Sequence, residues 1–338
     1  MSNLSPPAGV RNVSPPSGSP NTPVLRSLLF VPGDSERKQA KAIVSGADAL
    51  ILDLEDSVAV AQLPAARARV RELLQSQTDR SRQQLWVRVN ALSSGILLED
   101  LVAVFPGMPD GIVVPKAATA ADVAEVAHYL SALEAREGQG AGSTKLVVIA
   151  TETPQALLTL NSYGPVLAAD PRTHERLAGL TWGSEDLSAA MGITHKTDRQ
   201  GSLTFTFQLA RSLCVVSATA LGVQAIDGVY LDFRDAEGLK RDIESARRDG
   251  FTGKLAIHPD QVGPINEAFI PGTAEVEWAK RIVAAFAASP DAGVMSLDGQ
   301  MIDKPHLVQA RRILDLMGRR GAAHAPHGQP ARDALDRG

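Results

Sequence analysis

The chain has 338 residues, of which 44% are hydrophobic and 21% are charged, and this composition excludes a disordered or fibrous protein. The 34 Lys and Arg residues against 38 Asp and Glu residues give a formal net charge of -4. A nucleic-acid partner is therefore not expected, because no basic surplus is present to neutralise phosphates. No apolar run approaches the ~20 residues that span a bilayer, and the N-terminus lacks the apolar core of a secretion signal. We expect a cytoplasmic protein with no membrane partner.

The single cysteine, Cys214, excludes a disulfide framework or a cysteine-rich metal site. It lies in the apolar run 213–216, so we expect it to be a small core residue.

The two ends of the chain differ in composition from its middle. Residues 1–23 are mostly Pro, Ser, Asn and Gly, and residues 318–338 are similarly poor in apolar side chains, so both are predicted to be disordered tails. We predict a barrel over residues 24–270. A helix, a lid loop and a final helix should follow over residues 271–317.

Eight short apolar runs recur between the tails, at 27–32, 49–53, 85–90, 111–115, 145–150, 177–182, 225–230 and 254–257. Continuous apolar runs indicate strands that are buried on both faces, as in a parallel sheet. Helical patterns fill the gaps at 36–45, 64–75, 119–137, 153–162, 204–221 and 236–249. Eight such units predict a (β/α)8 TIM barrel with a C-terminal helical lid extension. The alternative is a doubly wound open sheet, although no GxGxxG motif opens a helix. After the eighth run we predict a helix over 275–288, a loop over 293–305 and a helix over 306–317.

In a barrel of this kind the functional side chains follow the carboxyl ends of the strands. Glu152 follows the fifth run and Asp186 follows the sixth. Two carboxylates brought together on one rim repel each other unless a cation lies between them, and oxygen ligands without His or Cys favour Mg²⁺ or Mn²⁺. The alternative is that both acids are helix N-caps or first-turn acids, which also follow strands.

Three cations are further candidates. Arg88 lies within an apolar strand, where a buried guanidinium needs an anionic partner. The partner is either a substrate carboxylate or a side chain such as Asp53 or Glu55. The two interpretations are compatible. Arg37 and Lys41, four apart on the first helix, share a face that would hold the phosphates of a large ligand or would simply be solvated.

His258, after the eighth run, is expected to be structural.

Several motifs, taken together and in order, resemble one family. They are RSLLFVPG at 26–33, SGADALILDLED at 45–56, VRVN at 87–90, VPK at 114–116, TET at 151–153, GSEDL at 183–187, KLAIHP at 254–259 and DGQMIDKP at 298–305. This pattern resembles the citrate lyase β-subunit-like CoA-ester lyases of the HpcH/HpaI aldolase/citrate lyase superfamily. The resemblance covers roughly residues 25–317.

The resemblance implies a TIM barrel assembled as a homotrimer or homohexamer. It implies a Mg²⁺-dependent lyase that cleaves or forms the C–C bond of a 3-hydroxyacyl-CoA such as malyl-, citramalyl- or citryl-CoA. The products would be an acyl-CoA, or a carrier-bound equivalent, and a 2-oxo acid. The alternatives are a class II pyruvate-type aldolase on free hydroxy-oxo acids, a CoA thioesterase of the same family, or a non-catalytic subunit of a larger lyase complex.

Individual roles carry over by position. The resemblance implies that Glu152 and Asp186 bind Mg²⁺ and that Arg88 holds the oxo acid and stabilises charge during catalysis. It also implies that Phe30, Arg37 and Lys41 contact CoA.

The resemblance further implies that Asp303 lies on a lid that closes over a neighbouring subunit's site, where its carboxyl group exchanges the proton at the enolate carbon. The alternative is that Asp303 caps the final helix. One departure from the pattern lies at 61–67, AQLPAAR, where many relatives have a Lys before the helix.

Overall fold

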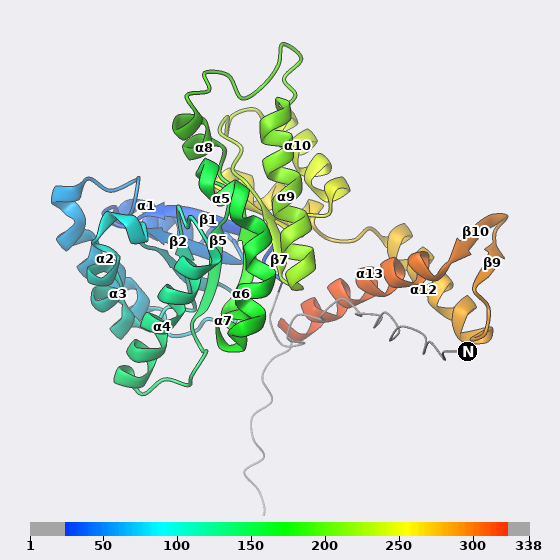
Figure 1. Ribbon diagram of the computed structural model, residues 1–338, viewed down its shortest axis with the longest axis horizontal. Coiled ribbons are helices and arrows are strands. Elements are labelled where there is room, and N and C mark those ends of the chain that lie inside the picture. The colour runs from blue at the N-terminus through cyan, green and yellow to red at the C-terminus, as the bar shows by residue number, and fades with distance from the viewer. Residues whose placement is uncertain (1–23, 324–338) are drawn as a thin grey trace, which may run out of the picture.

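Eight parallel strands close into a barrel in chain order, each paired with its neighbour in the sequence and the last with the first (Figure 1). The structure is a computed structural model and describes residues 24–323. The strands are β1 (Ser27–Pro32), β2 (Ala49–Asp53), β3 (Gln84–Arg88), β4 (Gly111–Val114), β5 (Lys145–Ile149), β6 (Leu177–Thr181), β7 (Gln224–Asp227) and β8 (Gly253–Ala256). The predicted barrel is confirmed, and the open sheet is excluded because β1 pairs with β8.

Alternate side chains of the strands fill the barrel interior. Leu28, Ile51, Trp86 and Val113 belong to one buried cluster inside the ring of strands. Trp86 needs space there, and Gly111 on the next strand provides it, since a Cβ at Gly111 would lie 2.3 Å from the Trp86 ring. The interior is therefore packed with side chains, and a ligand site has to lie at an end of the barrel.

Helices surround the strands and cover the outward-facing apolar side chains (Figure 1). They are α1 (Glu36–Ile43), α2 (Leu63–Ser76), α3 (Leu97–Val104), α4 (Ala120–Glu137), α5 (Pro154–Thr159), α6 (Tyr163–Ala169), α7 (Pro171–Arg176), α8 (Ser184–Met191), α9 (Phe205–Leu221), α10 (Ala236–Asp249) and α11 (Val262–Ala268). Cys214 of α9 is fully buried in this layer, as predicted. None of the helices within residues 24–323 has the length and apolar character needed to cross a membrane.

The remaining elements form a C-terminal arm, residues 273–323, that stands to one side of the barrel (Figure 1). It contains α12 (Thr273–Ala288), β9 (Val294–Leu297), β10 (Gln300–Asp303) and α13 (Lys304–Ala323). The arm has a small core of its own, in which Ile282 and Phe286 of α12 pack with Ile302 of β10.

The arm corrects two predictions. The segment 293–305, expected to be a loop, is an antiparallel hairpin whose turn at Asp298 and Gly299 has two positive φ angles, 51° and 78°. Asp-Gly flanked by short apolar runs is a hairpin signal, and the loop prediction overlooked it. The final helix begins at Lys304 and continues to Ala323, so a disordered tail from residue 318 is wrong for residues 318–323. The other predicted tail residues, 1–23 and 324–338, lie outside the described residues.

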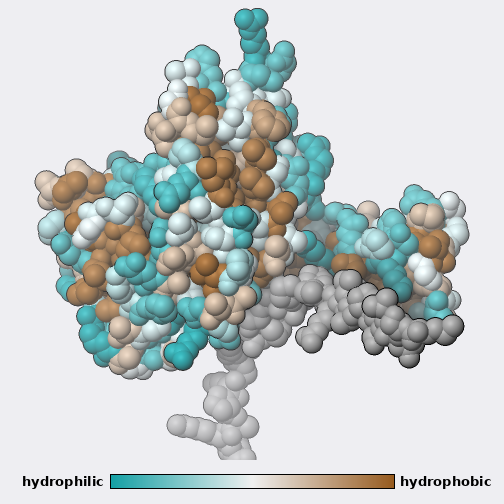
Figure 2. Space-filling model, viewed as in Figure 1, coloured by the Kyte–Doolittle hydropathy of each residue, from teal (hydrophilic) through white to brown (hydrophobic). Residues whose placement is uncertain are grey.

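Figure 2 shows hydrophobic side chains gathered on the face of the molecule that carries α9. Phe205, Leu209 and Val216 of this helix are exposed. An apolar patch of this kind on a folded chain is typical of a surface that contacts another protein.

Candidate active site

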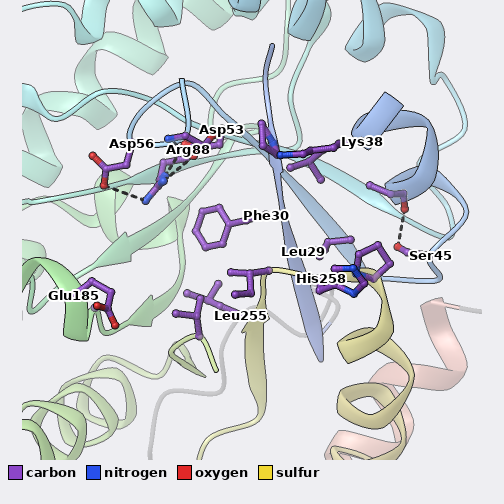
Figure 3. A pocket seen from close by; sticks show the side chains of 18 of the residues that line it. Leu29, Phe30, Lys38, Ser45, Asp53, Asp56, Arg88, Glu185, Leu255 and His258 are labelled. Carbon is purple, nitrogen blue, oxygen red and sulfur yellow. Dashed lines mark hydrogen bonds and ion pairs between the residues drawn. The ribbon is translucent and has the colours of Figure 1, made fainter. Parts of the chain in front are cut away.

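A cavity of about 1090 Å³ opens at the carboxyl ends of the strands. Of the seven residues that the sequence analysis assigned to the site, all except Asp303 line this cavity: Phe30, Arg37, Lys41, Arg88, Glu152 and Asp186. Figure 3 shows part of this lining, with Phe30 and Arg88 on one side and His258 on another.

Arg88 is the last residue of β3, and its register partner on β2 is Asp53. The Arg88 Nε and Nη2 atoms donate to the two Asp53 carboxylate oxygens at 2.6 and 2.7 Å, while Nη1 lies 3.1 Å from Glu55 Oε2. Burial alone would raise the pKa of Asp53, but the hydrogen bonds and charge of Arg88 hold it below its usual range. The salt-bridge reading of Arg88 is thus confirmed. Its binding of an oxo acid stays a prediction, because one edge of the guanidinium is already occupied.

Phe30 lies against the same guanidinium. The Arg88 Cζ atom is 4.7 Å from the centre of the Phe30 ring, within the range of a cation–π contact. The ring also lines the cavity, next to Arg88 in Figure 3. Phe30 therefore supports Arg88, and its contact with CoA stays a prediction.

Glu152 lies just beyond β5 and is buried, and Asp186 lies in the first turn of α8. Burial raises the pKa of Glu152 well above its usual range, and the nearby charges of Asp186 and Glu55 raise it further. Gly183 makes room for this carboxylate, since a Cβ there would lie 2.7 Å from Glu152 Cγ. The arrangement brings two like charges together at the cavity floor.

The alternative of helix N-caps or first-turn acids holds for one of these two acids, Asp186. The N-cap of α5 is Thr153, whose side chain accepts a hydrogen bond from the Ala156 N–H, so Glu152 is not the cap. The N-cap of α8 is Gly183, and Asp186 is a first-turn acid, which the helix dipole favours.

The donor set fits Mg²⁺. The ion takes one or two carboxylates from a protein and leaves its other positions to water and substrate. Glu152 and Asp186 supply two carboxylates that line the same cavity. The pair therefore suits a hard cation whose coordination a substrate completes. Mn²⁺ prefers similar oxygen ligands and stays a prediction.

Lys116, two residues beyond β4, contacts four acids at the carboxyl end of the barrel: Glu55, Asp56, Glu152 and Asp186. Its N–H donates to Glu152 Oε2 at 2.5 Å, and its ammonium lies 2.5 Å from Glu55 Oε1 and 3.2 Å from Asp186 Oδ1. Opposite charges at these distances raise the pKa of Lys116, although burial acts against them. The sequence places a lysine at the acidic rim but gives no reason to assign it a role.

The outer part of the cavity is more basic. Arg37 and Lys41 of α1 line it, as predicted, and Lys38 lies with them. His258 follows β8, the strand next to β1. Its ring stacks on that of Phe233 with centres 4.6 Å apart, and its Nδ1 accepts a hydrogen bond from the Asp260 N–H. These contacts agree with a structural role for His258, which also lines the cavity, and that role stays a prediction.

One wall of the cavity rests on a buried ionic cluster that the sequence analysis missed. Trp182 lines the cavity, and its indole Nε1 donates to Asp227 Oδ1 at 2.7 Å. Asp227 also pairs with Lys254 at 2.6 Å and with Arg211 at 3.0 Å. Burial would raise the pKa of Asp227, but the two cations hold it below its usual range. A lysine at the start of the apolar run 254–257 was the available signal.

Asp303 lies apart from these residues, at the end of β10 in the C-terminal arm. Its Oδ1 is 2.6 Å from Nδ1 of His306, and Asp303 is not among the described residues that line the cavity. Its predicted role over a neighbouring subunit stays a prediction.

Comparison with known proteins places this geometry in a family. Residues 26–259 match the sequence model of a protein family described as "HpcH/HpaI aldolase/citrate lyase". The chain belongs to the HpcH/HpaI aldolase/citrate lyase family. The prediction of a carbon–carbon lyase is confirmed at the level of that family.

Relatives within the HpcH/HpaI aldolase/citrate lyase family carry different names. The chain is 35% identical to a (3S)-malyl-CoA thioesterase of Cereibacter sphaeroides, over 86% of this chain and 93% of that protein. It is 33% identical to the human mitochondrial citramalyl-CoA lyase, over 86% and 85% of the two chains. A crystal structure of CitE from Mycobacterium tuberculosis in complex with magnesium, acetoacetate and coenzyme A is similar, with a TM-score of 0.69 and 32% identity over 87% of this chain and 98% of that chain.

Proposed function

We propose that the protein is a Mg²⁺-dependent lyase that cleaves or forms the C–C bond of a 3-hydroxyacyl-CoA of the malyl-, citramalyl- or citryl-CoA type. The products of cleavage are an acyl-CoA and a 2-oxo acid. The observation that carries this proposal is that Glu152 and Asp186, which both contact Lys116, line one cavity together with Arg88. The similar citramalyl-CoA lyase, and the similar CitE structure with magnesium and coenzyme A, support it.

Three side chains act on the acid portion of the substrate, two through the metal and one directly. Glu152 and Asp186 would hold Mg²⁺, which when bound supplies Lewis-acid polarisation of the substrate's oxygen atoms. Arg88, fixed by Asp53, Glu55 and Phe30, places its positive charge near the substrate carboxylate and stabilises negative charge that develops during bond cleavage. Trp182 shields this floor from one side.

The outer, basic part of the cavity takes the CoA portion. Arg37 and Lys41 bind its phosphates, because two cations on one helix face suit a ligand with several negative charges. Phe30 contacts the CoA chain on its way to the floor. A CoA thioester therefore fits the volume and charge of the cavity better than a small free hydroxy-oxo acid, which would leave the basic rim without a partner.

Asp303 would complete the site from a second copy of the chain. The arm that carries it stands beside the barrel, and the exposed apolar face of α9 is a surface suited to contact between copies in a homotrimer or homohexamer. On closure, the Asp303 carboxyl group exchanges the proton at the enolate carbon of the acyl-CoA.

Mixed oligomers test the role of Asp303. Asp303→Ala and Glu152→Gln proteins should each be nearly inactive. After verified subunit exchange, activity should partly return, since some sites would pair intact Glu152 with an intact neighbouring arm. Mixed oligomers without activity would mean that Asp303 acts within its own chain or has no part in the reaction.

A second candidate function is hydrolysis of the thioester, which the similarity to a (3S)-malyl-CoA thioesterase favours. Polarisation of the same substrate would then assist attack by water at the thioester carbonyl rather than cleavage of the C–C bond. A non-catalytic subunit is disfavoured, because Arg88, Glu152 and Asp186 are all present and all line the cavity.

A panel of 3-hydroxyacyl-CoA thioesters, each assayed with Mg²⁺ and with excess EDTA, tests the lyase proposal. We expect a 2-oxo acid to form from at least one malyl-, citramalyl- or citryl-type thioester with Mg²⁺ and not with EDTA. Equal rates in EDTA would refute the metal dependence, and no cleavage of any member would refute the substrate class.

A further inference from the structure

Lys116 is the residue through which the acids of the cavity floor are joined. Besides Glu55 and Asp186, its ammonium lies 3.1 Å from Asp56 Oδ2. The main-chain N–H of the same residue holds Glu152. One lysine thus contacts both carboxylates assigned to the metal, Asp186 through its side chain and Glu152 through its backbone.

The backbone of Lys116 adopts a conformation that favours glycine. Its φ is +51°, a conformation that glycine adopts freely and that residues with a Cβ adopt rarely. A glycine would donate the same N–H to Glu152 without this strain. The ammonium is therefore what distinguishes lysine from the residue that the backbone favours.

The charges around Lys116 are unbalanced. Within residues 24–323, Asp53, Glu55 and Asp56 lie with Glu152 and Asp186 around two contacting cations, Arg88 and Lys116. Arg88 is committed to Asp53, so Lys116 is the cation that reaches Asp186. An ammonium 3.2 Å from Asp186 lies where it neutralises that carboxylate in the absence of a divalent cation and repels such a cation when it arrives.

We propose that Lys116 is a positioning residue that acts as an internal counter-cation, holding Asp186 in the metal-free protein and competing with Mg²⁺ for it. The inference rests on the proposed assignment of Glu152 and Asp186 as the metal ligands. When Mg²⁺ binds, the ammonium gives up Asp186 and keeps Glu55 and Asp56, which are its partners on the other side. The competition lowers the affinity of the site for the free metal, so that a substrate carboxylate is needed to complete tight binding.

Titration calorimetry with MgCl₂, without substrate, tests this inference on the full chain. Lys116→Gly removes the ammonium, keeps the N–H that holds Glu152 and suits the positive φ. Because two charges a few Å apart in a protein interact by more than a factor of ten in equilibrium constant, we expect Mg²⁺ to bind at least about tenfold more tightly to this variant. Lys116→Arg keeps the charge and should bind Mg²⁺ within about threefold of the wild type.

The direction of the change separates this role from a merely structural one. If Lys116 served only to hold Asp186 in place, its loss would weaken Mg²⁺ binding. Weaker or unchanged binding by Lys116→Gly therefore overturns the proposal. Lys116→Met, which keeps the bulk of the side chain, provides the same measurement if the glycine variant does not fold.

A Glu152→Gln control distinguishes failure of the inference from failure of the proposed function. If Glu152→Gln weakens Mg²⁺ binding and Lys116→Gly does not strengthen it, the metal site is correct and the role of Lys116 is wrong. If Glu152→Gln leaves Mg²⁺ binding unchanged, or if neither the wild type nor Lys116→Gly binds Mg²⁺, the ligand assignment is wrong and the inference fails with it.

Discussion

Asp227 supports the wall of the cavity, and its replacement by Asn should destabilise the protein strongly. The carboxylate is almost fully buried and accepts hydrogen bonds from Lys254, Arg211 and Trp182 at 2.6, 3.0 and 2.7 Å. Asn keeps the shape and an acceptor for the Trp182 N–H, but it removes the negative charge between two buried cations. Breaking a buried ion pair by removing one partner costs about 3–5 kcal/mol. We expect the midpoint of thermal unfolding to fall by on the order of 10 °C.

The loss of stability caused by Asp227→Asn should depend on pH. Lys254 and Arg211 hold the pKa of Asp227 below its usual range, so the stabilisation is fully present above that range. It is lost as the pH falls below the usual Asp pKa of about 4 toward the lowered value. The difference in unfolding free energy between wild type and Asp227→Asn, measured by urea denaturation, should therefore be constant near neutral pH and shrink in acid.

A matched control isolates the charge. In the double variant Asp227→Asn with Lys254→Met, one of the two cations is removed as well, so the double variant should be more stable than Asp227→Asn alone. A loss below about 1 kcal/mol for Asp227→Asn, where buried pairs cost about 3–5 kcal/mol, would refute the reasoning. A difference that does not shrink in acid, or a double variant less stable than the single one, would also contradict it.

Three further substitutions test the cavity floor. Glu152→Gln should remain folded, because the site lies on a rim of the barrel. Its turnover should fall by at least about 10–100-fold, the scale that changes around a metal ligand reach. Full activity of the wild type in excess EDTA would contradict the metal dependence. Arg88→Lys keeps the charge but loses a charge-assisted hydrogen bond. In the condensation direction, the KM for the oxo acid should therefore rise by about tenfold or more, while the KM for the acyl-CoA changes little. An unfolded variant would show that Arg88 serves mainly to pair with Asp53. Gly183→Ala places a Cβ 2.7 Å from Glu152 Cγ. It should weaken Mg²⁺ binding, measured by calorimetry, and leave the circular dichroism spectrum unchanged. Normal Mg²⁺ affinity would show that Glu152 is not held where the structure places it.

The fold could be predicted because each buried strand is a short, continuous apolar run. Burial of every residue of β2 and β4 is the counterpart of the runs at 49–53 and 111–115. The C-terminal hairpin was missed because the strand predictions relied on the continuous apolar runs of a buried parallel sheet. The four residues of β9 and of β10 each include a polar one, Ser296 or Gln300, and both strands are largely exposed. Only the Asp298-Gly299 pair marked the turn.

The candidate site, like the fold, could be predicted from the sequence only in part. Residues that follow strands, such as Glu152 and Asp186, could be predicted, since the barrel brings all carboxyl ends of its strands to one rim. Contacts between side chains could not. The pairing of Arg88 with Asp53 depends on the register of β2 and β3, and the reach of the Lys116 ammonium depends on a positive φ that no sequence pattern marked.

The most direct test of the central claim is the identity of the products from the most active thioester with Mg²⁺, followed by mass spectrometry over time. A lyase predicts one acyl-CoA and one 2-oxo acid for each substrate consumed, with the thioester bond intact. Free CoA together with the intact hydroxy acid, without any 2-oxo acid, would contradict C–C cleavage and make the protein a thioesterase.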